Sequence, residues 1–149
     1  MKVLLVCNGD IKDLNIIKKL KKECNFVIGV DGGTRHLLKS GIKPDVILGD
    51  LDSIDELSLD TMKNKNIKFL KFPVKKDKTD TELAIDKAIS MGAKEITLAG
   101  ATGTRMDHTL ANIMLLKKFL KVGIRGKIIN SHNEIYIVNK SITLERKPG

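Results

Sequence analysis

Aromatic side chains are scarce in this sequence. Phe, Trp and Tyr together make up 3% of its 149 residues, and Trp is absent. The core must therefore be built from aliphatic side chains. The scarcity also argues against nucleic-acid binding, because such proteins usually stack bases on aromatic rings beside basic groups. The lysine excess, which gives a formal net charge of +9, is expected mostly on solvated helix faces, with attraction of an anionic nucleotide as the functional alternative.

Cysteines and long hydrophobic runs are also few. Cys7 and Cys24 have neither a CxxC nor a zinc-type spacing, so we expect two reduced, buried thiols. No apolar run is long enough to cross a membrane, and the first residues lead into a strand rather than a secretory leader. These absences predict a cytoplasmic protein that has no membrane partner.

Short apolar runs alternate with helix-patterned segments along most of the chain. This alternation is typical of βαβ units and predicts an α/β fold with an open, mostly parallel sheet and helices on both faces. Near-continuous apolar strands fit burial on both sides of the sheet. The expected strands cover 2–7, 26–30, 45–48, 67–72 and 95–100, and the expected helices cover 12–23, a short segment through Leu38, 55–65, 79–92 and 107–120.

The pattern changes after residue 125. Three strands are expected over 126–132, 134–139 and 141–146, joined by short polar connections. They predict the start of a C-terminal antiparallel β element. We therefore expect an α/β domain over 1–125 and the opening strands of a β domain over 126–149, within a longer polypeptide.

Polar and glycine-rich clusters follow the expected strands. In open parallel α/β sheets, ligands bind in the crevice at the carboxyl ends of the strands. The clustered aspartates therefore predict a binding site at this edge. They are Asp31, Asp50, Asp52, Asp55, Asp77, Asp80 and Asp107.

The segment "GDLDS" places Asp50 and Asp52 two residues apart. In an extended segment their carboxylates point the same way, and each would raise the pKa of the other unless a cation lay between them. Oxygen ligands suit Mg²⁺ first and Mn²⁺ second. Because Asp77 and Asp80 follow a neighbouring strand, we favour a metal site. The alternative is that Asp50 caps a helix and Asp52 faces solvent.

The segment "GATGTRMDH", residues 100–108, predicts a phosphate site. Gly100 and Gly103 allow backbone amides to approach a phosphate closely. The helix that starts near Asp107 offers its positive end to an anion, and Arg105 offers a planar fork of donors. The sequence holds no GxxxxGK[ST], so a P-loop is excluded.

The three histidines receive different predictions. His108 lies in the phosphate segment and is expected either to position a ligand or to act in acid–base chemistry. His36 and His132 are expected to have structural roles only.

Three segments in order resemble the thiamine pyrophosphokinase family. They are "DGGTRHLLKSGIKPDVILGDLDSI", "KDKTDTELAIDKAISMG" and "ITLAGATGTRMDHTLANIMLL", and the match covers roughly residues 28–118. The family transfers a pyrophosphoryl group from ATP to thiamine, giving thiamine diphosphate and AMP. The resemblance implies a homodimer in which thiamine lies between the α/β part of one chain and the β domain of the other.

The resemblance also implies roles for individual residues. Asp50 and Asp52 would hold Mg²⁺, and Asp80 would join this metal cluster and help to deprotonate the attacking hydroxyl. The remaining residues would contact ATP: Asp31 and Gly32 along the nucleotide, Asp77 and Thr81 near the triphosphate, and Arg105, Asp107, His108 and Asn112 in the nucleotide site.

Other functions stay open from the sequence. A hydroxymethylpterin pyrophosphokinase would use the same ATP site, and a non-catalytic module would bind ATP and Mg²⁺ without turnover. A glycosyltransferase-type DxD is a weaker alternative. A haloacid dehalogenase-type phosphatase needs a second carboxylate two residues after the first-strand aspartate, which the segment "CNGD" does not provide.

Overall fold

The computed structural model describes residues 1–50, 55–72 and 77–148. In this part of the chain the strands form one seven-stranded sheet in the order β4-β3-β2-β1-β5-β6-β7. All neighbouring strands pair in parallel except β6 and β7, which are antiparallel. The strands are β1 (Lys2–Val6), β2 (Phe26–Val30), β3 (Val46–Leu48), β4 (Lys68–Leu70), β5 (Glu95–Ala99), β6 (Arg125–Ile129) and β7 (Glu134–Ile135).

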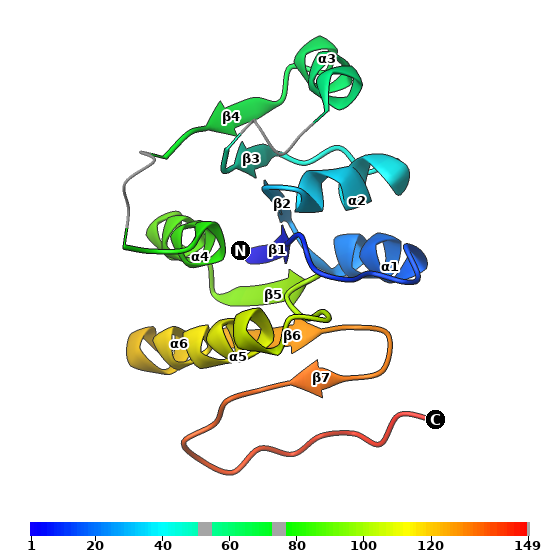
Figure 1. Cartoon of the computed structure of the whole chain (residues 1–149). Coiled ribbons are helices and arrows are strands. Elements are labelled where there is room, and N and C mark those ends of the chain that lie inside the picture. Colours follow the sequence, from blue (N-terminus) through cyan, green and yellow to red (C-terminus); the bar gives the residue numbers. More distant parts are fainter. Residues whose placement is uncertain (51–54, 73–76, 149) are drawn as a thin grey trace.

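Helices cover both faces of the sheet (Figure 1). α1 and α2 lie on one face, and α4, α5 and α6 lie on the other. The predicted architecture is therefore confirmed. The helices are α1 (Asn15–Glu23), α2 (Gly33–Lys39), α3 (Glu56–Asn64), α4 (Asp80–Ser90), α5 (Met106–Leu115) and α6 (Lys117–Val122).

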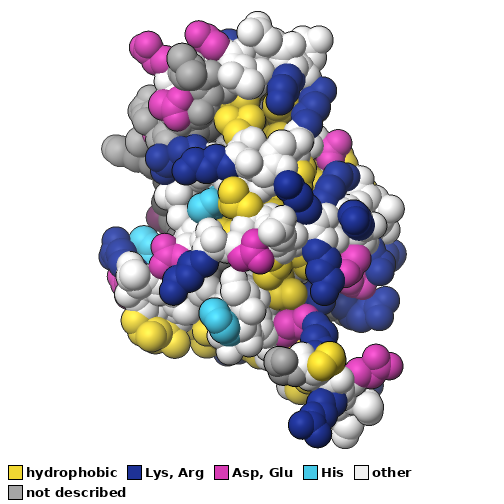
Figure 2. All heavy atoms as spheres, turned by 90° about the vertical axis from the view of Figure 1, so that its right-hand side faces the viewer, with side chains coloured by type: hydrophobic (Ala, Val, Ile, Leu, Met, Phe, Trp, Pro, Cys, Tyr) yellow, Lys and Arg dark blue, Asp and Glu magenta, His cyan; other side chains and the backbone are white. Residues whose placement is uncertain are grey.

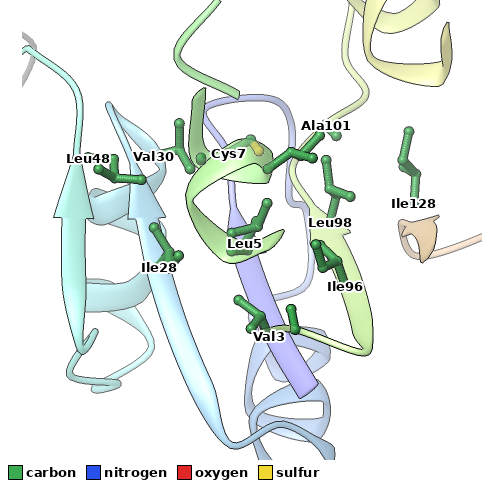
Figure 3. Close-up of a cluster of buried hydrophobic side chains, with 14 of the residues drawn as sticks. Val3, Leu5, Cys7, Ile28, Val30, Leu48, Ile96, Leu98, Ala101 and Ile128 are labelled. Carbon is green, nitrogen blue, oxygen red and sulfur yellow. The ribbon is translucent and has the colours of Figure 1, made fainter. Parts of the chain in front are cut away.

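The core consists mostly of aliphatic side chains on both faces of the sheet, as the scarcity of aromatics predicts, with Phe119 buried among them. Successive residues of a strand point to opposite faces, so β1 sends Leu4 and Val6 toward α1 and α2, and Val3 and Leu5 toward α4. Figure 3 shows the layer on the α4 side, where side chains of β1, β2, β3, β5 and β6 lie together. Burial on both sides explains why the strand sequences are apolar throughout.

The direction in which strands are added to the sheet reverses at β1. The chain adds β2, β3 and β4 on one side of β1, and then β5 and β6 on the other. The carboxyl ends of β1 and β5 therefore lie side by side at a topological switch point, where open α/β sheets bind their ligands.

The C-terminal segment agrees with the prediction only in part. β6 and β7 form the start of the predicted antiparallel element, but the remainder differs. β6 forms, but it pairs in parallel with β5 and so belongs to the main sheet; the division into domains at residue 125 stays a prediction. β7 contains only Glu134–Ile135, and the strand expected over 141–146 is wrong, because these residues have no regular structure. The strand was predicted from alternating apolar residues, but two of these, Ile142 and Leu144, are about half exposed. The segment therefore lacks the buried face that stabilises a strand.

The helix expected over 107–120 is also divided. α5 ends and α6 begins at Leu116, whose side chain is buried against the sheet. Met106, Leu110 and Met114 follow one another at four-residue spacing and are each more than half exposed, so one side of α5 is apolar and faces away from the core.

Charged side chains are spread over the surface. Figure 2 shows Lys and Arg distributed across one side of the molecule, with Asp and Glu among them, rather than gathered in a single stripe. This distribution agrees with the predicted solvated role of most lysines. In the described part of the chain, no helix has the length and apolar character needed to span a bilayer.

Candidate functional site

A pocket of about 610 Å³ lies at the switch point. Its walls come from the ends of β1, β2 and β5 and from the first turns of α4 and α5. The residues of this main pocket are Cys7, Asn8, Gly9, Asp10, Asp31, Lys78, Thr79, Asp80, Thr81, Gly100, Ala101, Thr102, Gly103, Thr104, Arg105, His108, Thr109, Ala111 and Asn112.

The loop after β1, residues 8–10, was missed as part of the site. Its backbone runs alongside the loop after β5: the N–H groups of Gly9 and Asp10 donate to the carbonyls of Gly100 and Thr102 at 2.6 and 2.9 Å. A side chain at Gly9 would clash with both carbonyl oxygens, so only glycine allows this close approach. The segment "CNGD" follows the first strand, and the strand-end rule could have found it.

His36 supports this loop from α2. Its Nε2 lies 2.9 Å from the carbonyl oxygen of Gly9 and donates a hydrogen bond to it. The prediction gave His36 a structural role, and the structure shows that the contact is to the backbone of a pocket wall.

Two acidic loops meet beside β2 and β3. Asp31 follows β2 and lines the main pocket, and its Oδ1 accepts a hydrogen bond from the backbone N–H of Asp50 at 3.0 Å. The N–H of Asp31 in turn donates to the carbonyl of Leu48 at 2.8 Å. Asp50 is exposed and is not among the residues that line the main pocket. The loops after β2 and β3 are thus joined through the Asp31 carboxylate.

The start of α4 brings Asp80 and Thr81 into the main pocket. Thr79 caps the helix: its hydroxyl accepts a hydrogen bond from the backbone N–H of Glu82 at 3.1 Å. Asp80 is the first helical residue, where the helix dipole favours a carboxylate. Asp77 is exposed and does not line the described pocket.

Two lysines, one just before α4 and one on α6, are held by carboxylates of α4. Lys78, which lines the main pocket, donates to Asp86 at 2.7 Å. Lys118 of α6 lies 2.7 Å from both Asp86 and Glu82. Burial opposes ionisation of Asp86, but the hydrogen bonds from Lys118 and Lys78 outweigh it and lower the pKa of this carboxyl. The network therefore attaches α6 to the helix that presents Asp80.

The loop after β5 forms the opposite wall. Gly100, Gly103 and Arg105, three of the predicted phosphate-site residues, all line the main pocket. Arg105 already forms a two-pronged contact with Asp107: Nε lies 3.2 Å from Oδ1, and an η nitrogen lies 2.7 Å from Oδ2. This hydrogen bonding lowers the pKa of the Asp107 carboxyl. Asp107 is outside the described lining and contacts the site through Arg105.

α5 contributes His108 and Asn112 to the same wall. Asn112 Nδ2 donates to the carbonyl of Ala101 at 2.8 Å, which fixes the turn between β5 and α5. His108 is exposed in the first turn of α5. Gly32, also predicted to contact the nucleotide, lies against Asn8 at the start of α2 and not in the described lining.

Cys7 closes the inner end of the main pocket. Its thiol is buried and lies 3.8 Å from the hydroxyl of Thr81. Burial raises the pKa of Cys7 to about 12, so the thiol is neutral at physiological pH. The prediction of a buried free thiol is confirmed for Cys7, but it is wrong for Cys24, which is only partly buried.

The described carboxylates do not by themselves form a metal centre. Among residues 1–50, 55–72 and 77–148, no three His, Cys, Asp or Glu side chains are close enough to hold an ion. Asp52, one of the predicted ligands, lies outside the described residues. The chemistry of the pocket nevertheless fits a hard cation: Asp10, Asp31 and Asp80 line it, while its two cations, Lys78 and Arg105, are both paired with carboxylates.

Known proteins are similar to this chain in sequence and in fold. Residues 17–128 match the family described as thiamin pyrophosphokinase, catalytic domain. The chain is 40% identical over 138 residues to thiamine pyrophosphokinase of Bacillus subtilis strain 168, covering 91% of this chain and 64% of that protein. The chain thus spans less than two thirds of that relative's length.

Solved structures agree. The crystal structure of thiamine pyrophosphokinase from Bacillus subtilis superposes with a TM-score of 0.77 at 34% identity, covering 91% of this chain and 63% of that one. Yeast thiamin pyrophosphokinase has the same TM-score at 17% identity, which shows a shared fold, and covers 93% of this chain and 61% of that one. Since the family match spans most of the chain and includes every strand from β2 to β5, this protein belongs to the thiamin pyrophosphokinase family.

Proposed function

We propose that this chain binds ATP and forms the nucleotide-binding part of an enzyme that transfers a pyrophosphoryl group from ATP to thiamine. The products are thiamine diphosphate and AMP. One observation carries the proposal: acidic and glycine-rich loops from four separate parts of a thiamin pyrophosphokinase-type sequence line one pocket at the switch point. The Bacillus subtilis relative is named for this reaction.

The balance of charge supports a metal-dependent phosphate site. A triphosphate tail is strongly anionic, and the carboxylates of Asp31 and Asp80 would repel it in the absence of a cation. We propose Mg²⁺, with Mn²⁺ as a substitute, held by Asp50, Asp52 and Asp80. When bound, the ion neutralises phosphate charge and orients the tail.

The chain's own groups then position and polarise the substrates. The loop around Gly100 and Gly103 lines the pocket where the tail would lie, and Arg105 adds donors when it shares its guanidinium between Asp107 and a phosphate. Thr81 and Asp77 stand at the start of α4, whose positive end also favours an anion. Positioning and charge stabilisation supply most of the rate in such transfers.

The transfer itself is a displacement at the β-phosphorus. The hydroxyl oxygen of thiamine forms a bond to this phosphorus, and the bond between the phosphorus and the oxygen that bridges to the α-phosphate breaks. AMP leaves with that electron pair. The hydroxyl proton passes to the carboxylate of Asp80, which acts as general base.

The experiment measures AMP and thiamine diphosphate formed by the 149-residue chain with ATP, Mg²⁺ and thiamine. Asp50→Asn and Asp80→Asn are each expected to reduce the rate by about a hundredfold or more while circular dichroism stays unchanged. Asp60→Asn, which makes the same charge change on the exposed face of α3, is the matched control. Near-normal rates in either site variant would refute the metal assignment.

Two further outcomes would redirect the proposal. Product formation with a hydroxymethylpterin in place of thiamine would change the acceptor. Calorimetric binding of ATP with Mg²⁺ but no AMP from either acceptor would favour a non-catalytic module. The homodimer and the cytoplasmic location stay predictions, and light scattering of the purified chain tests the first.

A further inference from the structure

A lysine of the main pocket shares its carboxylate partner with a lysine of α6. Lys78 stands two residues before α4, and its Nζ lies 2.7 Å from Asp86 Oδ2. The Nζ of Lys118 lies 2.7 Å from the other oxygen of the same carboxylate, Oδ1, and also 2.7 Å from Glu82 Oε1. These four side chains thus form a chain of ion pairs that begins at the pocket and ends on α6.

The two lysines differ in how firmly they are held. The side chain of Lys118 is 27% exposed and contacts two carboxylates, whereas that of Lys78 is 48% exposed and contacts Asp86. A lysine has a long, flexible stem, and an exposed ion pair contributes little net stability because water screens it. Lys78 is therefore the member of this chain that can leave its partner.

Lys118 removes the usual obstacle to such a departure. When one partner leaves an ion pair, the remaining charge is left uncompensated, which is costly in a partly buried place. Asp86 uses a separate oxygen for each lysine, so it keeps its contact with Lys118 when Lys78 moves away. The departure then leaves the Asp86 carboxylate still paired.

We propose that Lys78 exchanges the Asp86 carboxylate for a phosphate oxygen when the nucleotide binds, and that Lys118 is a positioning residue for this exchange. The inference rests on the proposed function. A triphosphate carries several negative charges and so attracts an ammonium group more strongly than one carboxylate does. Lys78 also stands beside the first turn of α4, where the helix dipole favours an anion. Lys78 thus adds a cation to the α4 wall of the main pocket, across from Arg105.

The exchange predicts opposite effects of two substitutions on the affinity for phosphate. Lys118→Met leaves Asp86 with Lys78 alone, and so holds Lys78 away from the phosphate. Asp86→Asn removes the competing charge, and so frees Lys78. A merely structural role of these residues predicts a loss of affinity in both variants, because each substitution breaks a contact between α4 and α6.

The experiment measures the affinity of the full chain for ATP and for inorganic tripolyphosphate, by calorimetry in the presence of Mg²⁺. We expect Lys78→Met to weaken binding of both ligands about tenfold. Lys118→Met is expected to weaken binding about threefold, and Asp86→Asn to strengthen it about threefold. Both effects should vanish in a Lys78→Met background, because both act through Lys78. Lys117→Met, which makes the same charge change at the exposed neighbouring residue of α6, is the matched control.

Three results would overturn the exchange. Unchanged affinity in Lys78→Met would exclude its contact with phosphate. Losses in both Lys118→Met and Asp86→Asn, or no change in either, would contradict the competition for Lys78. Effects that persist in the Lys78→Met background would show that the chain of ion pairs only holds α6 on α4.

The outcomes also separate this inference from the proposed function. If the chain bound ATP but formed no AMP, the proposed function would fail, while opposite effects that depend on Lys78 would still establish the exchange. If AMP formed at the normal rate and Lys78→Met bound both ligands normally, the exchange would fail and the proposed function would stand. No binding of either ligand would overturn both.

Discussion

The Asp31 carboxylate accepts a hydrogen bond from the backbone N–H of Asp50 at 3.0 Å. This bond joins the loops that follow two neighbouring parallel strands, β2 and β3. The backbone turns sharply directly after β3, at Gly49. The φ of Gly49 is +125°, a conformation that L side chains rarely adopt. A side chain at Gly49 would also clash with Asp31 Oδ1. One glycine therefore controls how the two acidic loops meet.

Gly49→Ala is expected to disrupt the acidic edge of the site. The strain of a positive φ and the clash with Asp31 act together, so unfolding free energy should fall by about 2 kcal/mol or more, with loss of transfer activity. Gly92→Ala is the matched control, because Gly92 also has a positive φ, +84°, but nothing within 4 Å of an added Cβ. This control should cost about 1 kcal/mol and keep its activity. Urea denaturation and AMP assays make the comparison, and equal effects would mean that the Asp31–Asp50 arrangement is unimportant.

Much of the fold could be predicted because its strands and helices follow from short, local sequence patterns. Parallel strands buried on both faces must be apolar throughout, so β1, β2 and β5 could be located closely from their sequences. The site edge followed from one rule, that loops after parallel strands converge. The rule placed Asp31, Asp80 and the loop around Gly103 in one pocket.

The errors concern interactions between distant residues. Ile142 and Leu144 alternate as a strand should, but a strand forms only where a partner and a buried face exist, and local sequence does not specify these. The contact of His36 with Gly9 joins residues 27 apart, and a histidine on a helix gives no sign of its partner. The position of the turn around Asn130 could not be predicted from local sequence either, because its place beside the loop after β5 depends on the parallel pairing of β6.

His36→Leu is expected to loosen the loop after β1. It removes the donor to the Gly9 carbonyl, a part-buried group that would lose about 1 kcal/mol of hydrogen bonding. Because residues 8–10 line the main pocket, the KM for ATP should rise about fivefold while kcat changes little. His36→Gln keeps an N–H donor at similar reach and should restore most of the affinity. Identical KM values in the Leu and Gln variants would show that packing, not the hydrogen bond, explains this position.

Thr79→Ala is expected to fray the first turn of α4. The Thr79 hydroxyl accepts a hydrogen bond from the backbone N–H of Glu82, and loss of such a helix cap costs about 1 kcal/mol of stability. The same turn carries Asp80, so the transfer rate should fall as well. Thr79→Ser keeps the capping oxygen and should retain both properties. Thermal unfolding and initial rates provide the measurements; a serine variant as unstable as the alanine variant would argue that the methyl group, not the cap, stabilises this turn.

The buried thiol of Cys7 should make stability depend on alkaline pH. Burial raises its pKa from 9.0 to about 12, so between these values the unfolded chain loses a proton that the folded chain keeps. Folding stability from this group is therefore complete below about pH 9 and declines as pH rises, by up to about 1.4 kcal/mol per pH unit. Urea denaturation at about pH 8 and about pH 10.5 should reveal the decline in wild type and a smaller one in Cys7→Ala. Tyr136, whose pKa burial also raises to about 12, is present in both proteins, so the difference between the two slopes isolates Cys7. Parallel slopes would mean that the thiol ionises equally in the folded and unfolded chains, and that solvent reaches the inner end of the main pocket.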